Sequence, residues 1–206
     1  MTSVGKLRRA WGDMVRAVRE DHGMMHRYDV RYAADLRGRA ATVASDVVTR
    51  VGFQMLVAYR MMRFCVEAEI PVAPRVGSRL IRHLYGSDLH WDARLEPGIV
   101  IVHGMGLSIS HAACVQRGTI LFQNVTLGMG TDPQTRKSGA PTLERDVHIG
   151  PGTTIIGPVT VGTGTKVTAN CLVRASVPAH CIVEAPAPTV TPRVRHAPAN
   201  DVGSGV

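Results

Sequence analysis

The spacing of hydrophobic positions changes partway along this chain of 206 residues. In the first part, long apolar side chains recur with the spacing of an amphipathic helix. This spacing predicts a helix over 47–68, with Pro71 as its stop, and a shorter helix that follows Pro74 and ends at Gly86. An earlier helix is expected over residues 6–20. The chain is therefore expected to begin with a short α-helical N-terminal region, residues 1–86.

Aliphatic residues then recur at every sixth position, and most are followed four positions later by a second apolar or β-branched residue. A six-residue period is typical of a parallel β-helix, in which three short strands and three turns complete one coil. The expected fold is mainly β, a left-handed parallel β-helix of hexapeptide repeats over 87–184, with a C-terminal tail over 185–206. The repeat positions are Leu89, Leu95, Ile101, Leu107, then Ile109, Val115, Leu121, Leu127, and finally Leu143, Ile149, Ile155, Val161, Val167 and Val173.

Two irregularities interrupt this repeat. The stretch 128–142 loses the period and is rich in Gly, Pro, Ser and Thr, which predicts a loop extruded from the prism. A slip of two residues, between Leu107 and Ile109, lies close to His103. A regular prism has no pocket, so we expect the functional site where the loop and the slip break the repeat.

Charge and composition narrow the possible partners. The net charge is +8, but the basic residues are spread along the chain and do not alternate with aromatic residues, as a groove for single strands requires. We therefore expect no nucleic-acid partner, while a polyanionic small ligand or an anionic surface stays possible. An apolar leader and an apolar run long enough to span a bilayer are both missing from the sequence. With four isolated cysteines, the sequence favours a cytoplasmic protein without a membrane span.

The histidines carry the candidate chemistry. His22 and His26 are four residues apart, a spacing that can serve a metal, but no third ligand is near them in the sequence. A solvated helix face is therefore expected there, and no metal. A metal-dependent β-helix hydratase of the carbonic anhydrase type requires a His-x-x-x-x-His pair, and none of the nine histidines has that spacing. On its own, His103 would be interpreted as a surface histidine.

Residues 86–130, GSDLHWDARLEPGIVIVHGMGLSISHAACVQRGTILFQNVTLGMG, resemble the serine acetyltransferase family of hexapeptide acyltransferases. The matching motifs are DLHW, HGMG and QNVTLGMG, and GFQMLVAYR at 52–60 is similar to the family's helix before the prism. The resemblance extends over about residues 35–185. It implies an O-acetyltransferase that moves the acetyl group of its co-substrate acetyl-CoA to a hydroxyl group.

The resemblance also implies two catalytic residues. His103 is then the general base that removes the hydroxyl proton, and Asp88 orients its imidazole. These residues are fifteen positions apart, close to the length of one coil, so we expect their side chains to lie within hydrogen-bond reach. We also expect backbone N–H groups near Gly104 or Gly106 to hold the oxyanion of the reacting carbonyl.

Departures from the family pattern concern the acceptor. Val102 replaces an acidic residue of the family, and SGAP replaces its Arg-His before proline. The resemblance leaves Arg136 or Lys137 to bind a substrate carboxylate, and Asp35 or Asp46 to bind a substrate amine. Serine is the first candidate acceptor, and a hydroxyl of a sugar or natural product is the second. A catalytically inactive scaffold is the third alternative.

The family pattern finally suggests how the cofactor binds and how chains assemble. Lys166, Thr168 and Ala169 match the turn that lies along coenzyme A, whereas EAPAPTV replaces the family's C-terminal Gly-x-Pro-Ala-Arg. Prisms of this family place the acyl donor between neighbouring subunits, so a homotrimer is expected. The helical region is shorter than that of the family, which makes a pair of trimers a weaker expectation.

Overall fold

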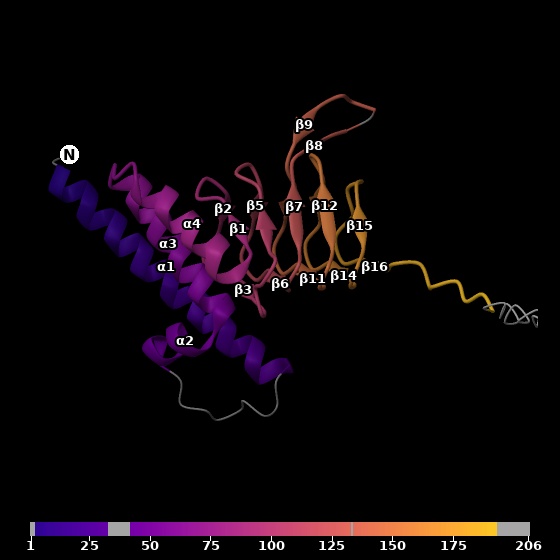
Figure 1. The fold of residues 1–206 in the computed structure, drawn as a ribbon, viewed down its shortest axis with the longest axis horizontal. Coiled ribbons are helices and arrows are strands. Elements are labelled where there is room, and N and C mark those ends of the chain that lie inside the picture. The colour runs from indigo at the N-terminus through magenta and orange to yellow at the C-terminus, as the bar shows by residue number, and fades with distance from the viewer. Residues whose placement is uncertain (1–2, 33–41, 133, 193–206) are drawn as a thin grey trace, which may run out of the picture.

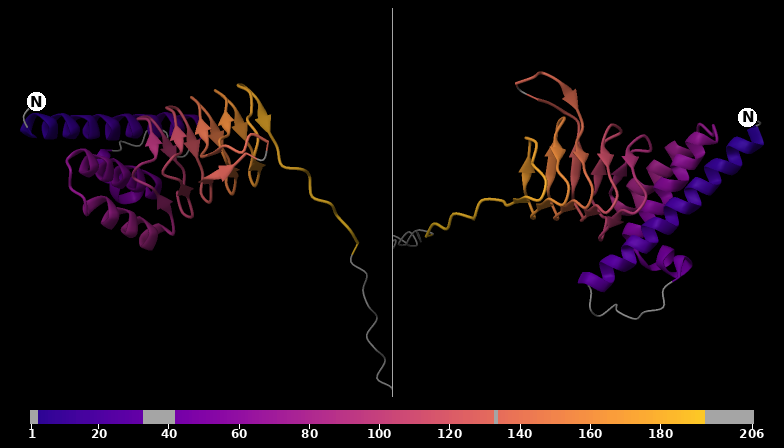
Figure 2. Two further views of the ribbon diagram at one scale, coloured as in Figure 1. Left: turned by 90° about the horizontal axis from the view of Figure 1, so that it is seen from above. Right: turned by 180° about the vertical axis from the view of Figure 1, so that it is seen from behind.

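Helices gather at one end of a triangular prism of short strands (Figure 1). The computed structural model describes residues 3–32, 42–132 and 134–192. The described helices are α1 (Ser3–Tyr32), α2 (Val43–Thr49), α3 (Val51–Glu67) and α4 (Ala73–Tyr85). Helices α1, α3 and α4 contact the first coil, and residues 185–192 leave the prism at its opposite end (Figure 2).

The helices differ from the predicted ones in two places. Helix α1 extends well beyond 6–20, because buried residues spaced along it continue to pack against α3 as far as Met25. Most of the predicted helix over 47–68 is helical, but it is divided between α2 and α3, because the chain is extended at Arg50, with φ −115° and ψ 100°. Helix α4 agrees with the prediction and ends at Gly86, whose left-handed backbone has φ 59°.

Three parallel sheets form the faces of the prism, and their strand orders confirm the predicted left-handed parallel β-helix. The first sheet contains β1 (Asp88–Leu89), β4 (Ser108–Ile109), β7 (Thr126–Gly128), β12 (Thr154–Ile156) and β15 (Leu172–Val173). The second contains β2 (Arg94–Leu95), β5 (Cys114–Val115), β10 (Thr142–Leu143) and β13 (Thr160–Val161). The third contains β3 (Val100–Ile101), β6 (Ile120–Leu121), β11 (His148–Ile149), β14 (Lys166–Val167) and β16 (Ile182–Val183).

The repeat positions form the core of the prism. In the first sheet, the inward residues Leu89, Ile109, Leu127, Ile155 and Val173 stack in register from coil to coil. All five side chains are buried, as the hexapeptide pattern predicts. The second position of each repeat is buried as well over most of the prism, where it fills the corners: Val147, Thr153, Val159, Thr165 and Cys171.

The slip in the repeat is an enlarged first coil. Leu89 pairs with Ile109, whereas Ile109 pairs with Leu127, so the first coil is two residues longer than the second. Val100 of β3 pairs with Ile120 of β6, twenty residues later, whereas Ser108 of β4 pairs with Thr126 of β7, eighteen residues later. The two extra residues therefore lie between β3 and β4. The segment between β3 and β4 contains His103, which places this histidine on an irregular turn of the prism.

The extruded loop contains a short hairpin. Strands β8 (Gly130–Thr131) and β9 (Ser138–Gly139) pair antiparallel within the stretch 128–142. Figure 1 shows this hairpin standing away from the prism, on the side opposite α2. None of the helices in the described part of the chain is both long and apolar enough to cross a membrane.

Candidate active site

His103 lies on an exposed turn with a left-handed backbone. Its φ is 63°, and Gly104 and Gly106 follow with φ of 76° and 69°. Histidine tolerates this conformation better than most side chains, whereas a β-branched residue would be strained. Glycine is favoured at position 104 because its positive φ is strained for other residues, and an added Cβ would lie 3.3 Å from the Gly52 Cα and 2.7 Å from the sulfur of Met55 in α3. The turn is therefore pressed against the helical region, with the His103 side chain outside.

Hydrogen bonds of Ser87 connect this turn to the start of the coil, next to β1. Its hydroxyl donates to the Gly104 carbonyl at 2.9 Å and accepts from the Leu107 N–H at 3.2 Å. Ser87 is buried and immediately precedes Asp88. The sequence does not single out this residue, because nothing in a single sequence shows that a serine sixteen positions before His103 closes the turn.

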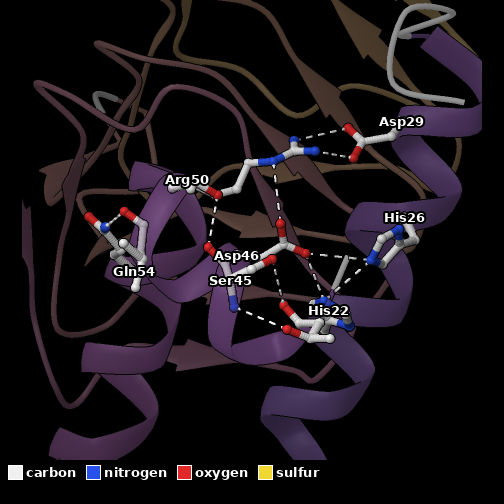
Figure 3. Close-up of polar contacts among 10 residues, drawn as sticks. His22, His26, Asp29, Ser45, Asp46, Arg50 and Gln54 are labelled. Carbon is white, nitrogen blue, oxygen red and sulfur yellow. Dashed lines mark hydrogen bonds and ion pairs between the residues drawn. The ribbon is translucent and has the colours of Figure 1, made fainter. Parts of the chain in front are cut away.

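A pocket opens beside His103 at the junction of prism and helices. Its lining combines apolar side chains, among them Phe53, Val102 and Met105, with the ion pair of Asp29 and Arg50. Arg50 donates to both carboxylate oxygens of Asp29, at 3.2 and 2.6 Å (Figure 3). This pair could not be seen in the sequence, since Asp29 lies in α1 and Arg50 lies between α2 and α3, and the two residues meet only in the fold.

The predicted hydrogen bond between Asp88 and His103 is not formed. Both are described residues, and the structure joins them by neither a hydrogen bond nor an ion pair. The Asp88 carboxylate instead accepts from Arg82 Nη2, with both oxygens at 2.9 Å. The strand register sets Asp88 opposite Ser108, five residues after His103.

The proposed oxyanion donors are also engaged elsewhere. The Gly104 N–H donates to the Val102 carbonyl at 2.8 Å, and the Gly106 N–H donates to the Tyr85 carbonyl at 3.3 Å. The expectation that these groups face a reacting carbonyl is therefore wrong for this conformation. Both N–H groups stabilise the His103 turn.

The predicted acceptor residues are not gathered in the pocket. Asp35 lies outside the described residues. Asp46 is buried and directed towards His22 and His26, and it does not line the pocket. Arg136 and Lys137 are exposed in the β8–β9 connection and do not line the pocket of their own chain.

The predicted cofactor residues share an edge of the prism with His103. Because the strands of the third sheet are parallel, the turns that follow β3, β6, β11 and β14 lie along one edge. His103 follows β3, and Thr168 and Ala169 follow β14, which itself contains Lys166. Gln123 follows β6 on the same edge, and its side-chain oxygen is buried without a hydrogen-bond partner in the described structure.

Another histidine on the third sheet, His148, is harder to protonate because of its surroundings. The His148 ring stacks on Phe122, with the ring centroids 5.3 Å apart. Burial, and then the positive charge of Lys166, lower the pKa of His148. This histidine is therefore suited to packing beneath the edge rather than to carrying a charge there.

The fold defines the class of the protein, a hexapeptide-repeat protein built on a parallel β-helix. No protein-family model matches the chain. It is 39% identical to a serine acetyltransferase of Synechococcus elongatus over 132 residues, which cover 64% of this chain and 53% of that protein. It is 30% identical to a serine acetyltransferase of Bacillus licheniformis over 154 residues, which cover 75% of this chain and 70% of that protein. The chain belongs to the serine acetyltransferase family.

Solved structures share the fold. The serine acetyltransferase of Neisseria gonorrhoeae in complex with serine matches with a TM-score of 0.70 at 21% identity, over 85% of this chain and 69% of that one. A serine acetyltransferase in complex with CoA matches with a TM-score of 0.68 at 20% identity, over 88% of this chain and 71% of that one. The chain spans about half the length of the first two curated relatives, 53% and 48%.

Proposed function

We propose that this chain transfers the acetyl group of acetyl-CoA to the hydroxyl of serine, with His103 as the general base. The observation that carries the proposal is the position of His103, exposed on a fastened turn at a pocket that also holds an acidic and a basic side chain. The family of the chain and the CoA and serine complexes of similar proteins support the same activity. This chemistry requires no metal.

The reaction is an acyl transfer through a tetrahedral intermediate. His103 removes the hydroxyl proton as the serine oxygen attacks the thioester carbonyl, and the new C–O bond forms. The C–S bond then breaks, and the proton on the imidazole passes to the departing thiolate of coenzyme A. Asp88 is proposed to orient the imidazole, which requires its carboxylate to exchange Arg82 for His103 when substrates bind.

A zwitterionic acceptor needs an anion for its amine and a cation for its carboxylate. Asp29 and Arg50 offer both charges in the pocket beside His103, and in the free protein they neutralise each other. In the complex, the serine amine would pair with Asp29 and the serine carboxylate with Arg50. Asp29→Asn should therefore raise the KM for serine. An unchanged KM would remove this pair from the substrate site.

An uncharged acceptor is the second candidate. The apolar Val102 stands beside His103 and lines the same pocket, which suits a sugar or natural-product hydroxyl better than an amine. The two candidates are separated by the rate of CoA thiol release with serine against a panel of sugars and other amino acids. Release that is fastest with serine supports the proposal, and release that is faster with an uncharged acceptor overturns the choice of serine.

Coenzyme A is proposed to lie along the edge formed by the third sheet. Lys166 and Ala169 are exposed there, with Thr168 between strand and turn, and the edge leads from them towards His103. The positive charge of Lys166 suits the phosphates of the cofactor. The net charge of +8 suits a polyanionic ligand as well.

The loop residues Arg136 and Lys137 are expected to bind the serine carboxylate from a neighbouring subunit. If they do, the double variant Arg136→Ala, Lys137→Ala should raise the KM for serine by about 10–150-fold, the equivalent of one lost charge-assisted hydrogen bond. Steady-state kinetics at saturating acetyl-CoA measure this effect. Gln134→Ala, an exposed and uncharged neighbour in the same loop, should leave the KM unchanged. A KM that also survives the double variant would exclude the loop from the site.

A homotrimer is part of the proposal. The β8–β9 hairpin stands away from its own prism, and its two cations do not line the pocket of their own chain. A closed ring of three chains would bring each hairpin to a neighbour through one repeated contact. Light scattering should give three times the chain mass of 22.2 kDa. The mass of a single chain under assay conditions would contradict this assembly.

A cytoplasmic location completes the proposal. The four cysteines, Cys65, Cys114, Cys171 and Cys181, are unpaired. Unpaired thiols suit a reducing compartment. Fractionation of cells that produce the chain should recover it with the cytoplasmic proteins, and recovery outside the cytoplasm would refute the location.

A further inference from the structure

Three side chains from two helices converge behind the pocket. His22 and His26 project from the same face of α1, and Asp46 projects from α2 towards both (Figure 3). The distance from Asp46 Oδ2 is 2.9 Å to His22 Nε2 and 3.5 Å to His26 Nε2. The two Nε2 atoms lie 3.3 Å apart. The expectation of a solvated helix face without a third ligand is therefore wrong, because Asp46 supplies the third group from a distant segment.

Hydrogen bonds can join at most two sides of this triangle of atoms at once. An ionised Asp46 carboxylate only accepts, so both histidines would have to donate from Nε2 to be satisfied by it. The two Nε2–H groups would then face each other at 3.3 Å with no acceptor between them. If either histidine carries its proton on Nδ1 instead, its Nε2 lone pair faces the Asp46 oxygen. Each arrangement leaves one side of the triangle without a hydrogen bond; when the His22 Nε2–H is shared between Asp46 and His26, this is the 3.5 Å side between Asp46 and His26.

A cation satisfies all three atoms at once. Ligands of Zn²⁺ at about 2.0–2.1 Å in tetrahedral geometry lie about 3.3–3.4 Å from one another. The distances of 2.9, 3.3 and 3.5 Å between the three atoms bracket this value. All three ligand atoms lie within 4.8 Å of one another without any movement of the chain. Two histidines at i and i+4 on a helix are also a common arrangement for zinc.

The surroundings of the cluster suit a bound ion. The Asp46 side chain is 3% exposed and that of His22 14%, whereas His26 is 35% exposed and leaves a path for entry. The ring of Phe53 packs against His22, with the centroids 5.4 Å apart, and limits the access of water on that side. Arg50 lies 3.8 Å from Asp46 Oδ1, but its positive charge is paired more closely with Asp29.

We propose that His22, His26 and Asp46 bind a divalent transition-metal ion, with Zn²⁺ as the expected occupant. None of the three ligands lines the pocket beside His103, so the ion acts structurally and takes no part in acyl transfer. It would join α1 to α2 at the point where the chain turns into α3. Since Asp46 also contacts Arg50, the ion would hold one wall of the pocket in place. This proposal stands independently of the proposed acyl transfer.

The test is a zinc titration of the full chain without an affinity tag, after treatment with a chelator. One Zn²⁺ per chain is expected, measured by competition with a chromophoric chelator. His26→Gln should weaken this binding by at least about 100-fold, since the loss of even an outer partner of a zinc ligand costs about 10–100-fold. His83→Gln, a change of an exposed histidine on α4, is the matched control and should bind as the unchanged chain does.

Cobalt gives a second readout that does not depend on the variants folding well. Co²⁺ bound by three such ligands and a water should produce visible d–d absorption in the unchanged chain and in the His83→Gln variant. The same absorption should be missing from His22→Gln and from Asp46→Asn. Equal zinc affinity in the unchanged chain and His26→Gln would overturn the proposal. So would the lack of any stoichiometric zinc or cobalt binding by the unchanged chain.

Discussion

Replacing His103 with asparagine should lower the rate of acetyl transfer by about 10²–10⁴-fold, the usual contribution of a general base. Asparagine is the sharper choice than alanine, because it tolerates the left-handed backbone that His103 adopts at φ 63°. The turn, fastened by Ser87, is then kept while the proton acceptor is lost. The measurement is kcat for thiol release, together with the thermal midpoint of unfolding.

The control for this change is His83→Asn. His83 is exposed on α4, and its Nδ1 atom lies 2.8 Å from the Arg79 carbonyl oxygen one turn earlier. It should keep the activity of the unchanged chain. If His103→Asn retains activity within about threefold, with an unchanged thermal midpoint, a role as general base is excluded.

The second large effect is expected on stability, at the buried contact between the helices and the prism. Asp21 accepts from Arg60 and from the backbone N–H groups of Gly98 and Ile99, at 2.8–3.2 Å. Burial raises the pKa of Asp21, and the charge of Arg60 opposes that shift. Arg60 in turn donates to the carbonyls of Leu95 and Glu96, so the pair connects α1, α3 and the first coil.

Asp21→Ala should therefore lower the free energy of unfolding by about 3–5 kcal/mol, since it leaves a buried guanidinium and two backbone donors without an anion. Urea unfolding at a fixed protein concentration measures this loss. Asp13→Ala is the matched control, because Asp13 lies on the same helix and pairs with Arg16 in solvent. Its effect should stay within about 0.5 kcal/mol. A loss of unfolding free energy below about 1 kcal/mol for Asp21→Ala would show that this contact does little to hold the helical region against the prism.

The prism could be predicted from the sequence because the six-residue period of each repeat defines which of its side chains point inward. Leu127 and Ile155 are inward residues whose neighbours on the next coils follow from the six-residue period alone. The helical region has no such repetition. Arg50, where α2 and α3 meet, is paired with Asp29, twenty-one residues away, and α1 packs along α3.

In the candidate site, too, the features that follow from the repeat could be predicted, and those that depend on distant contacts could not. The exposed His103 turn lies beside the predicted slip, because the two extra residues of the first coil belong to that segment. The partners of the turn were not predictable, since Ser87 joins it from the start of the same coil, and Met55 and the Asp29–Arg50 pair approach it from the helical region. The spacing of Asp88 and His103 suggested a contact, but spacing alone does not place a side chain on a coil that carries an insertion.

The most direct test of the account is the identity of the product. The purified chain, incubated with acetyl-CoA and serine, should release coenzyme A and form O-acetylserine, identified by NMR and mass spectrometry. The His103→Asn variant should form it about 10²–10⁴-fold more slowly. If no O-acetylserine forms at any serine concentration while another hydroxyl compound is acetylated, or if no acetyl transfer occurs at all, the proposed function is contradicted.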